Sequence, residues 1–354
     1  MELPTLHVIG VFYAVHCTAH SQCAYTGKAL RFPGMMQARG YRVLEYGNEG
    51  SESSADEKVA MLDVAEYESH FPWDASKPLG RYCGPGSPGH TLFQERLVAA
   101  LAARVKPNDF ICYTLGPQFQ RLPINFPAQI HIETGIGYAE VLPNTLRIFE
   151  SNAWMHYHLG KVNSGGRALD FVVPNYYDVA AWEPSTAPGE YVAFLGRLAS
   201  DKGMRVIHLL AERGVRVRVC GPGSRERWQH DNIEYVDPIS GLERSAFLGG
   251  ASCVLAPSEY VEPFGGAAVE AMLCGTPVVA TSFGAYTETI EDGVTGFLCH
   301  TIADWLQAIA RAPELDRGLI ARRARERYSI EAVGTQFDHA FKTIASLLPL
   351  NDSQ

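Results

Sequence analysis

Two glutamates, Glu262 and Glu270, stand around a Phe-Gly-Gly turn in the stretch EYVEPFGGAAVEAMLCGTPVVAT at residues 259–281. Glu270 lies among apolar residues, where an unpaired carboxylate would be costly to bury. Each carboxylate oxygen can accept from one hydroxyl, so the vicinal diol of a ribose would satisfy Glu270, and Glu262 could hold hydroxyls of a second sugar. The alternative is that Glu270 pairs with a basic residue of its own domain, which is the commoner arrangement for a lone glutamate. The residues alone leave both alternatives open.

The glycines between the two carboxylates predict an anion site. VLAPSEY is predicted to be a strand, and Gly265 and Gly266 open a predicted helix at 265–274. Glycine lets a ligand approach the backbone closely, and the free N–H groups and dipole of a helix N-terminus favour a phosphate. We therefore expect a phosphate-bearing ligand beside the diol.

Short apolar runs alternate with helical patterns along most of the chain, which is typical of βαβ units around a parallel sheet. In the first half, the predicted strands are LHVIGVFY, YRVLEYG, FICYTLG, QIHIE, LRIFES and DFVVP. In the second half, we predict strands at 190–196, 215–221, 252–256, 276–281 and 296–300, and helices at 203–213, 242–249 and 265–274. Residues 48–59 and 71–90 are predicted to be surface loops.

The 354 residues exceed what one hydrophobic core usually supports, so two α/β domains are expected. The stretch WEPSTAPG at 182–189 breaks every pattern, which predicts Rossmann-like domains at 1–181 and 190–329. Ser329 is a predicted N-cap for a last helix at 330–349, which we expect to return to the first domain. Its apolar stripe consists of Val333, Phe337, Phe341, Ile344 and Leu348. Ligands of such sheets bind beyond the carboxyl ends of the strands, so we expect the site between the two domains.

The charge balance disfavours a broad surface for nucleic acid or for an anionic membrane. Lys and Arg number 30 against 39 Asp and Glu, for a net charge of −9, although a local basic groove is not excluded. No apolar run reaches the ~18 residues needed to span a bilayer. The N-terminus MELPTLHVIG lacks the cationic flank of a secretory signal, and the eight cysteines form no C-x-x-C. We expect a cytoplasmic protein with reduced thiols.

The motif E-P-F-G-x-x-x-x-E, formed by residues 262–270, resembles the donor-site motif of family 4 glycosyltransferases. FLGRLASDKG resembles the G-R-(x)4-K-G element of that family and supplies Gly196, Arg197, Lys202 and Gly203. VRVCGPG at 217–223 and the downstream GTPVVATSFGAYTETIEDGVTGFL extend the resemblance over nearly all of 190–300. In the first half it is limited to VVPNYYD.

This resemblance implies a GT-B fold and a retaining transfer of a hexose-type sugar from a nucleotide-diphosphate donor, with a UDP-sugar as the first choice, to an acceptor hydroxyl. Arg197 and Lys202 would stabilise the departing diphosphate, and Glu262 would orient the sugar. The leaving phosphate would accept the proton of the acceptor, so no dedicated general base is required. The donor-binding residues implied are Thr26, Gly27, Gly196, Phe264, Gly265, Gly266 and Glu270.

The resemblance also implies that no metal is needed, and the basic pair would replace it. The sequence has no D-x-D, and His16/His20 and His156/His158 lack further ligands. Lys28 follows Thr26 and Gly27 in CAYTGKAL, but position 22 is Gln and position 29 is Ala, so a P-loop is excluded. GPGSPG at 84–89 matches G-x-G-x-x-G, yet its prolines are expected to prevent the helix that must follow.

His131 and Glu133 end a predicted central strand, where the family often has a polar residue that touches the donor sugar or the acceptor. A satisfied role in the core fits either residue as well. The segment 232–240 is expected to approach the base through backbone groups, and loops 16–24 and 71–90 to meet the acceptor. Two other functions remain possible: a sugar-nucleotide epimerase on the same scaffold, for which no acid and base set is evident, and a two-lobed sugar-binding protein.

Overall fold

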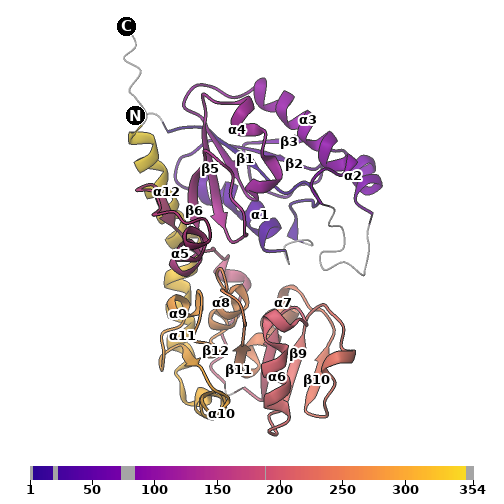
Figure 1. Ribbon diagram of the computed structural model, residues 1–354, viewed down its shortest axis with the longest axis vertical. Coiled ribbons are helices and arrows are strands. Elements are labelled where there is room, and N and C mark those ends of the chain that lie inside the picture. Colours follow the sequence, from indigo (N-terminus) through magenta and orange to yellow (C-terminus); the bar gives the residue numbers. More distant parts are fainter. Residues whose placement is uncertain (1–2, 19–22, 73–83, 188, 348–354) are drawn as a thin grey trace. The chain divides into compact units, whose positions relative to one another are not determined.

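Apolar and β-branched runs form two fully parallel sheets in the computed structural model, which describes residues 3–18, 23–72, 84–187 and 189–347 (Figure 1). The first sheet has the order β3-β2-β1-β4-β5-β6-β7 and the second has β10-β9-β8-β11-β12-β13. Both orders reverse direction once, between β1 and β4 and between β8 and β11. This reversal is the topological switch point at which ligands of such sheets bind.

The strands of the first sheet are β1 (Leu6–Ile9), β2 (Val43–Gly47), β3 (Glu57–Ala60), β4 (Phe110–Tyr113), β5 (Ile130–Ile136), β6 (Leu146–Phe149) and β7 (Asp170–Val172). Those of the second sheet are β8 (Tyr191–Leu195), β9 (Val217–Cys220), β10 (Ile233–Val236), β11 (Ala251–Ala256), β12 (Val278–Thr281) and β13 (Gly296–Cys299).

Helices α1 to α9 lie between strands along the chain, as a doubly wound topology requires, whereas α10 to α12 follow the last strand. In the first half they are α1 (Ala24–Gln37), α2 (Val64–His70), α3 (Pro88–Ala102), α4 (Leu122–Asn125) and α5 (Asn152–Lys161). The second half has α6 (Met204–Ala211), α7 (Gly241–Gly249), α8 (Gly266–Leu273), α9 (Tyr286–Thr289), α10 (Ile302–Arg311), α11 (Arg317–Tyr328) and α12 (Ile330–Ser346). Within the described residues, none of the helices combines the length and the apolarity needed to cross a membrane.

The chain divides into two compact units. The first unit consists of Met1–Glu150, Gly165–Val173 and the chain from Val333 onward, and the second of Ser151–Ser164 and Pro174–Ala332. Helix α5 therefore clusters with the second unit, whereas the sequence grouped it with the first. The stretch after Trp182 also packs on the second unit: the Ser185 N–H donates to the Cys274 carbonyl at 3.0 Å.

Helix α12 packs in the first unit through its apolar stripe. The Ser329 hydroxyl accepts from the Ala332 N–H at 3.2 Å, so it caps the helix as predicted. Phe337 meets Phe32 edge-on at 5.3 Å between ring centroids, and Phe341 meets Phe110 at 5.6 Å. Leu348, the last predicted member of the stripe, lies outside the described residues.

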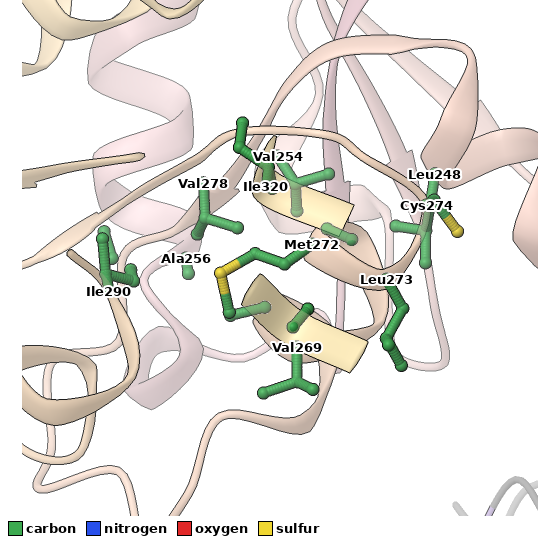
Figure 2. Close-up of a cluster of buried hydrophobic side chains, with 14 of the residues drawn as sticks. Leu248, Val254, Ala256, Val269, Met272, Leu273, Cys274, Val278, Ile290 and Ile320 are labelled. Atoms are coloured by element: carbon green, nitrogen blue, oxygen red, sulfur yellow. The ribbon is translucent and has the colours of Figure 1, made fainter. Parts of the chain in front are cut away.

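The apolar residues of α8 pack between the second sheet and α11. Figure 2 shows Met272 of α8 close to Val254 and Val278 of the sheet and to Ile320 of α11. These side chains are at most 1% exposed, so the helix that follows the Phe-Gly-Gly turn is fixed by the core of its unit.

Two expectations about local structure were wrong, and one strand was missed. Residues 57–59, predicted as part of a loop, belong to β3, and the segment 232–240, for which no strand was predicted, contains β10. Both are edge strands, which have one covered edge only and therefore carry more polar residues than central strands. Pro88 does not prevent a helix but occupies the first turn of α3, where a missing N–H costs nothing, behind the N-cap Ser87.

Candidate active site

The loops after β8, β9 and β11 meet at the switch point of the second sheet through close backbone contacts. The Gly196 N–H donates to the Cys220 carbonyl at 3.0 Å, and the Glu259 N–H donates to the Asp201 carbonyl at 2.8 Å. Gly203 has φ +82°, and a Cβ there would lie 1.9 Å from the Pro257 carbonyl oxygen. Only glycine fits where the loop after β8 passes the Pro257 carbonyl, which explains the last residue of GRLASDKG.

Lys202 and Glu262 are in direct contact in this region. The Lys202 Nζ lies 3.0 Å and 2.9 Å from the two carboxylate oxygens of Glu262, and 2.6 Å from the Tyr260 hydroxyl oxygen. It also lies 4.8 Å from the centroid of the Tyr260 ring, within cation–π range. The Lys202 side chain is 23% exposed and that of Glu262 is 8% exposed. The structure thus brings two of the three predicted catalytic residues together.

Hydroxyl groups complete the surroundings of Glu262. Its carboxylate accepts from the Ser258 hydroxyl at 2.7 Å and from the Tyr286 hydroxyl at 3.4 Å. Burial, and then the charge of Glu262, raise the pKa of both Tyr260 and Tyr286, so both phenols stay protonated donors. The Glu262 carbonyl accepts from the Ala285 N–H at 3.0 Å, which holds the residue from the main chain as well.

Arg197 belongs to the same group of loops but does not contact Lys202 or Glu262 through any hydrogen bond of the described residues. Its Nη2 donates to Asp201 Oδ2 at 2.8 Å, and its side chain is about half exposed. Arg197 is therefore the more solvent-accessible of the two predicted cations.

The turn before α8 requires glycine for a geometric reason. Gly265 is the N-cap of α8 and has φ +84°. A Cβ at this position would lie 2.5 Å from Cε1 of Tyr286. By contrast, the ring of Phe264 is buried in the core, parallel to the ring of Tyr177 at 6.5 Å and edge-on to Tyr328 at 5.7 Å. The Phe264 side chain therefore orders the turn from the core side, and only its backbone remains for the predicted donor contact.

Glu270 has an internal partner, Arg244 of α7. Nη2 of Arg244 donates to Oε2 of Glu270 in an ion pair that is largely buried, with the side chains 21% and 13% exposed. This is the alternative that the sequence left open, and the arginine itself was missed because it lies 26 residues away in another helix. A buried lone carboxylate signals that a basic partner exists without indicating which one.

Thr26 and Gly27 lie in the first turn of α1, in the first unit, and both are buried. Among the described residues, the Thr26 hydroxyl has no hydrogen-bond partner. Lys28 pairs with Glu150 and donates to the Gly135 carbonyl at 3.1 Å. It is thus a buried structural cation, in agreement with the exclusion of a P-loop.

His131 and Glu133 are both tied into the first unit. The His131 ring lies 2.6 Å from the Tyr113 hydroxyl and 2.8 Å from the Phe126 carbonyl. Glu133 accepts from the Tyr138 hydroxyl and the Thr145 hydroxyl, both at 2.8 Å, and from the Leu142 N–H at 2.9 Å. Burial raises the pKa of Glu133 to about 7 despite these donors. Both residues have satisfied core contacts, and a contact with substrate stays a prediction.

The remaining candidates are the histidines considered as metal ligands and the loops predicted to contact the acceptor. His16 is buried and pairs with Glu45, whereas His20 and Cys83 lie outside the described residues, as do parts of the predicted acceptor loops 16–24 and 71–90. His156 is exposed and His158 is buried on α5. No three His, Cys, Asp or Glu side chains of the described residues are grouped as metal ligands would be. Metal independence stays a prediction.

The comparison with protein families places a known domain on the second unit. Residues 189–314 match the family model described as "Glycosyl transferases group 1". This range contains both predicted motifs, the loop with Lys202 and the turn with Glu262.

Curated relatives match at about 30% identity. They include a glycogen synthase of Mycobacterium tuberculosis, 30% identical over 196 residues that cover 49% of this chain and 47% of the relative. A D-inositol 3-phosphate glycosyltransferase of Mycolicibacterium smegmatis is 33% identical over 180 residues, covering 46% and 41%. The chain thus matches somewhat less than half the length of these relatives.

Solved structures match over the whole chain. The sucrose-phosphate synthase of Thermosynechococcus elongatus has a TM-score of 0.67 at 18% identity and covers 97% of this chain and 99% of its own. The Anabaena protein HepE, in complex with UDP and glucose, has a TM-score of 0.66 at 16% identity, with coverages of 98% and 100%. At these identities, the likeness establishes the two-sheet GT-B fold. Residues 189–314 are thus similar to group 1 glycosyl transferases, and the chain has the two-sheet GT-B fold.

Proposed function

We propose that the protein is a retaining hexosyltransferase that moves a sugar from a nucleotide-diphosphate donor, with a UDP-sugar as the first candidate, to an acceptor hydroxyl. The observation that carries this proposal is the contact between the Lys202 ammonium and the Glu262 carboxylate, which adjoins the start of α8. A cation, an acid and a helix N-terminus suit a ligand with both phosphate and hydroxyl groups.

The names of similar proteins support the same donor class. HepE is a solved neighbour with UDP-glucose bound, and the relatives named above are glycogen synthase and D-inositol 3-phosphate glycosyltransferase. These names share sugar transfer and differ in the acceptor. We therefore commit to the donor class for this chain and to a hydroxyl as the accepting group.

In the proposed mechanism, the bond between the anomeric carbon and the diphosphate oxygen breaks while the acceptor oxygen bonds to the same face of the sugar. The acceptor proton passes to the leaving diphosphate, so the protein supplies no base. Lys202 and Arg197 stabilise the negative charge that grows on the diphosphate, and the first N–H groups of α8 assist. Glu262, held by Ser258 and Tyr286, accepts hydrogen bonds from the sugar and orients it.

We further propose that the reaction needs no divalent metal and occurs in the cytoplasm. The cation pair would replace the metal as the counter-charge of the diphosphate. The seven described cysteines are all unpaired thiols, which suits a reducing compartment. EDTA, at a concentration that strips bound Mg²⁺ and Mn²⁺, is expected to leave turnover unchanged. A loss of turnover that Mg²⁺ restores would contradict metal independence.

The experiment that tests the function measures products with UDP-, GDP- and ADP-glucose, with and without a panel of hydroxyl acceptors. We expect release of the free nucleoside diphosphate to rise with acceptor and the new glycoside to keep the α configuration of the donor, by NMR. An altered sugar that stays on its nucleotide would indicate an epimerase. Tight binding of free sugar without turnover would indicate a sugar-binding protein.

A further inference from the structure

We propose that Arg244 is a positioning residue that holds the Glu270 carboxylate in place to accept hydrogen bonds from the ribose hydroxyls of the donor nucleotide. The inference rests on the proposed function, because it presumes that a nucleotide binds at this carboxylate. It goes further by assigning a role to a residue outside the recognised motifs and by making ribose recognition depend on an ion pair between two helices.

The two side chains come from neighbouring helices that the core fixes. Arg244 lies in the first half of α7, and Glu270 lies in α8 just after its first turn; the two helices pack against each other. Nη2 of Arg244 donates to Oε2 of Glu270, so one carboxylate oxygen is engaged by the guanidinium. The helices cannot move without disturbing the core around Met272, so the pair is held from both sides.

The surroundings of Arg244 explain why it stays in this position. Its Nε is buried and, among the described residues, has no hydrogen-bond partner. Burial acts to lower the pKa of Arg244, but the charge and the hydrogen bond of Glu270, with smaller contributions from Tyr177 and Cys220, together raise this pKa, so the guanidinium remains charged. A buried arginine that forgoes one hydrogen bond is stabilised chiefly by its carboxylate partner.

A glutamate side chain that is already fixed before the ligand binds contributes more to the affinity than a mobile one. A free Glu side chain loses rotamer entropy when it binds a diol, and a preorganised carboxylate has already lost it. The guanidinium engages Oε2, and Oε1 still has acceptor capacity for a hydroxyl. Because every ribonucleotide carries the same hydroxyls, this contribution should not depend on the base.

The test compares ribo- and 2′-deoxyribonucleotides by isothermal titration calorimetry. UDP, GDP and ADP are first titrated into the wild-type chain, and the tightest binder is then compared with its 2′-deoxy counterpart. We expect the wild type to prefer the ribonucleotide about tenfold, as a charge-assisted hydrogen bond implies. Arg244→Met should lose most of this preference together with about tenfold in affinity, whereas Arg244→Lys should keep part of both. Glu270→Gln and the double variant should resemble Arg244→Met, because the two residues act as one unit.

Arg218 of β9 offers a matched control, since it also pairs with a glutamate, Glu234 of β10, but both side chains are exposed. Arg218→Met is expected to leave the affinities for the ribonucleotide and for its 2′-deoxy counterpart unchanged. Melting temperatures identify any variant that is unfolded. Arg244→Lys remains informative if Arg244→Met does not fold. Wild-type preference in a folded Arg244→Met variant would overturn the inference and leave the proposed function intact. If no nucleoside diphosphate binds to the wild type, the proposed function fails, and the inference fails with it.

Discussion

The ammonium of Lys202 is the most constrained cation among the predicted site residues. It contacts both oxygens of Glu262 and the hydroxyl of Tyr260. Arg197 is half exposed and pairs with Asp201 in its own loop. The two cations therefore differ in mobility, and we expect Lys202 to act at a fixed point and Arg197 to adapt to the ligand.

Lys202→Ala should lower kcat/KM about 10²–10³-fold, which corresponds to about 2.7–4 kcal/mol of transition-state stabilisation, by analogy with the loss of one preorganised donor. The physical reason is that the Lys202 ammonium, which Glu262 and Tyr260 hold in place, would stabilise the negative charge that grows on the leaving diphosphate. Arg205→Ala is the control, because Arg205 lies three residues away, is 73% exposed and has only a 3.5 Å ion pair. The measurement is kcat/KM of Lys202→Ala and Arg205→Ala by steady-state kinetics. Equal activities would remove Lys202 from the reaction.

A second prediction at the level of single residues concerns pH and Glu133, whose pKa burial raises from 4.5 to about 7. Between these values the folded chain keeps a proton that the unfolded chain has released, so the free energy of unfolding falls as the pH rises. Over this range we expect Glu133 to lower the stability by about 1–3 kcal/mol. The measurement is urea unfolding between pH 5 and 8 of the wild type and of Glu133→Gln.

Glu133→Gln should show a flatter pH dependence than the wild type, because an amide does not titrate. Glu95→Gln, at an exposed position of α3, controls for the loss of an ordinary surface carboxylate. Parallel curves for the wild type and Glu133→Gln would show that the raised pKa is wrong. They would also show that the donors from Tyr138, Thr145 and Leu142 outweigh the effect of burial.

Sequence patterns predicted the acidic and basic residues of the site but not their partners. The spacing of Glu262 and Glu270 around two glycines was informative because the first of them, Gly265, is required by geometry. Arg244 and Tyr286 had no such signal, since each approaches from a distant segment whose local pattern is an ordinary amphipathic helix or turn. Phe264 was assigned to the ligand because it belongs to a motif, although its apolar ring is buried in the core.

The loops of the site are held by glycines at which a side chain would collide with backbone. Gly203 links the loop after β8 to Pro257 after β11, and Gly221 has φ +150° with a Cβ position 1.9 Å from the Gly196 carbonyl oxygen. These contacts let three strand ends approach closely enough to share one ligand. The glycines of the motifs are therefore structural requirements of the loops as much as ligand contacts.

Gly203→Ala should destabilise the protein far more than Gly214→Ala. Both glycines have positive φ, +82° and +87°, so both substitutions carry the left-handed strain of about 1–2 kcal/mol. Only at position 203 would the new Cβ meet a backbone atom, since nothing lies within 4 Å of a Cβ at position 214. Differential scanning calorimetry of the two variants measures how much Tm falls because of the contact between residue 203 and the Pro257 carbonyl. Equal losses in Tm would mean that the loops after β8 and β11 separate easily.

The central strands of both sheets and the edge strands β7 and β13 were predicted from their apolar runs, whereas the edge strands β3 and β10 were not. β1, β4, β8 and β11 are buried on both faces, so their sequences are nearly continuous in hydrophobic residues. β3 reads EKVA, with alternate residues exposed, and β10 reads IEYV. Such short half-polar segments resemble loops, and only pairing with β2 or β9 shows that they are strands.

At the level of the whole molecule, the two units repeat one topology with different local chemistry. Six strands follow the same order in each sheet, with the same switch point, and the first sheet adds β7 at one edge. Lys202 and Glu262 follow the carboxyl ends of β8 and β11, whereas β5 of the first unit carries Glu133, whose hydrogen bonds are satisfied. Fold alone therefore does not identify the donor site. The side chains at the strand ends favour the second unit for the proposed donor site.

Hydrogen exchange of the full chain tests this assignment. We expect the tightest-binding nucleoside diphosphate, at about one hundred times its Kd, to stabilise the folded state by about 2.7 kcal/mol and to slow exchange at the carboxyl ends of the second sheet. The protected peptides should cover 196–203 and 257–270, because these residues form the loops around Lys202, Glu262 and Glu270. Peptides that cover 212–216, before β9 at the opposite end of the same sheet, serve as the internal control. Protection of 212–216 without protection of 257–270 would place the nucleotide at the wrong end of the sheet and would refute the donor site, since a diphosphate cannot contact the N-terminus of α8 from there.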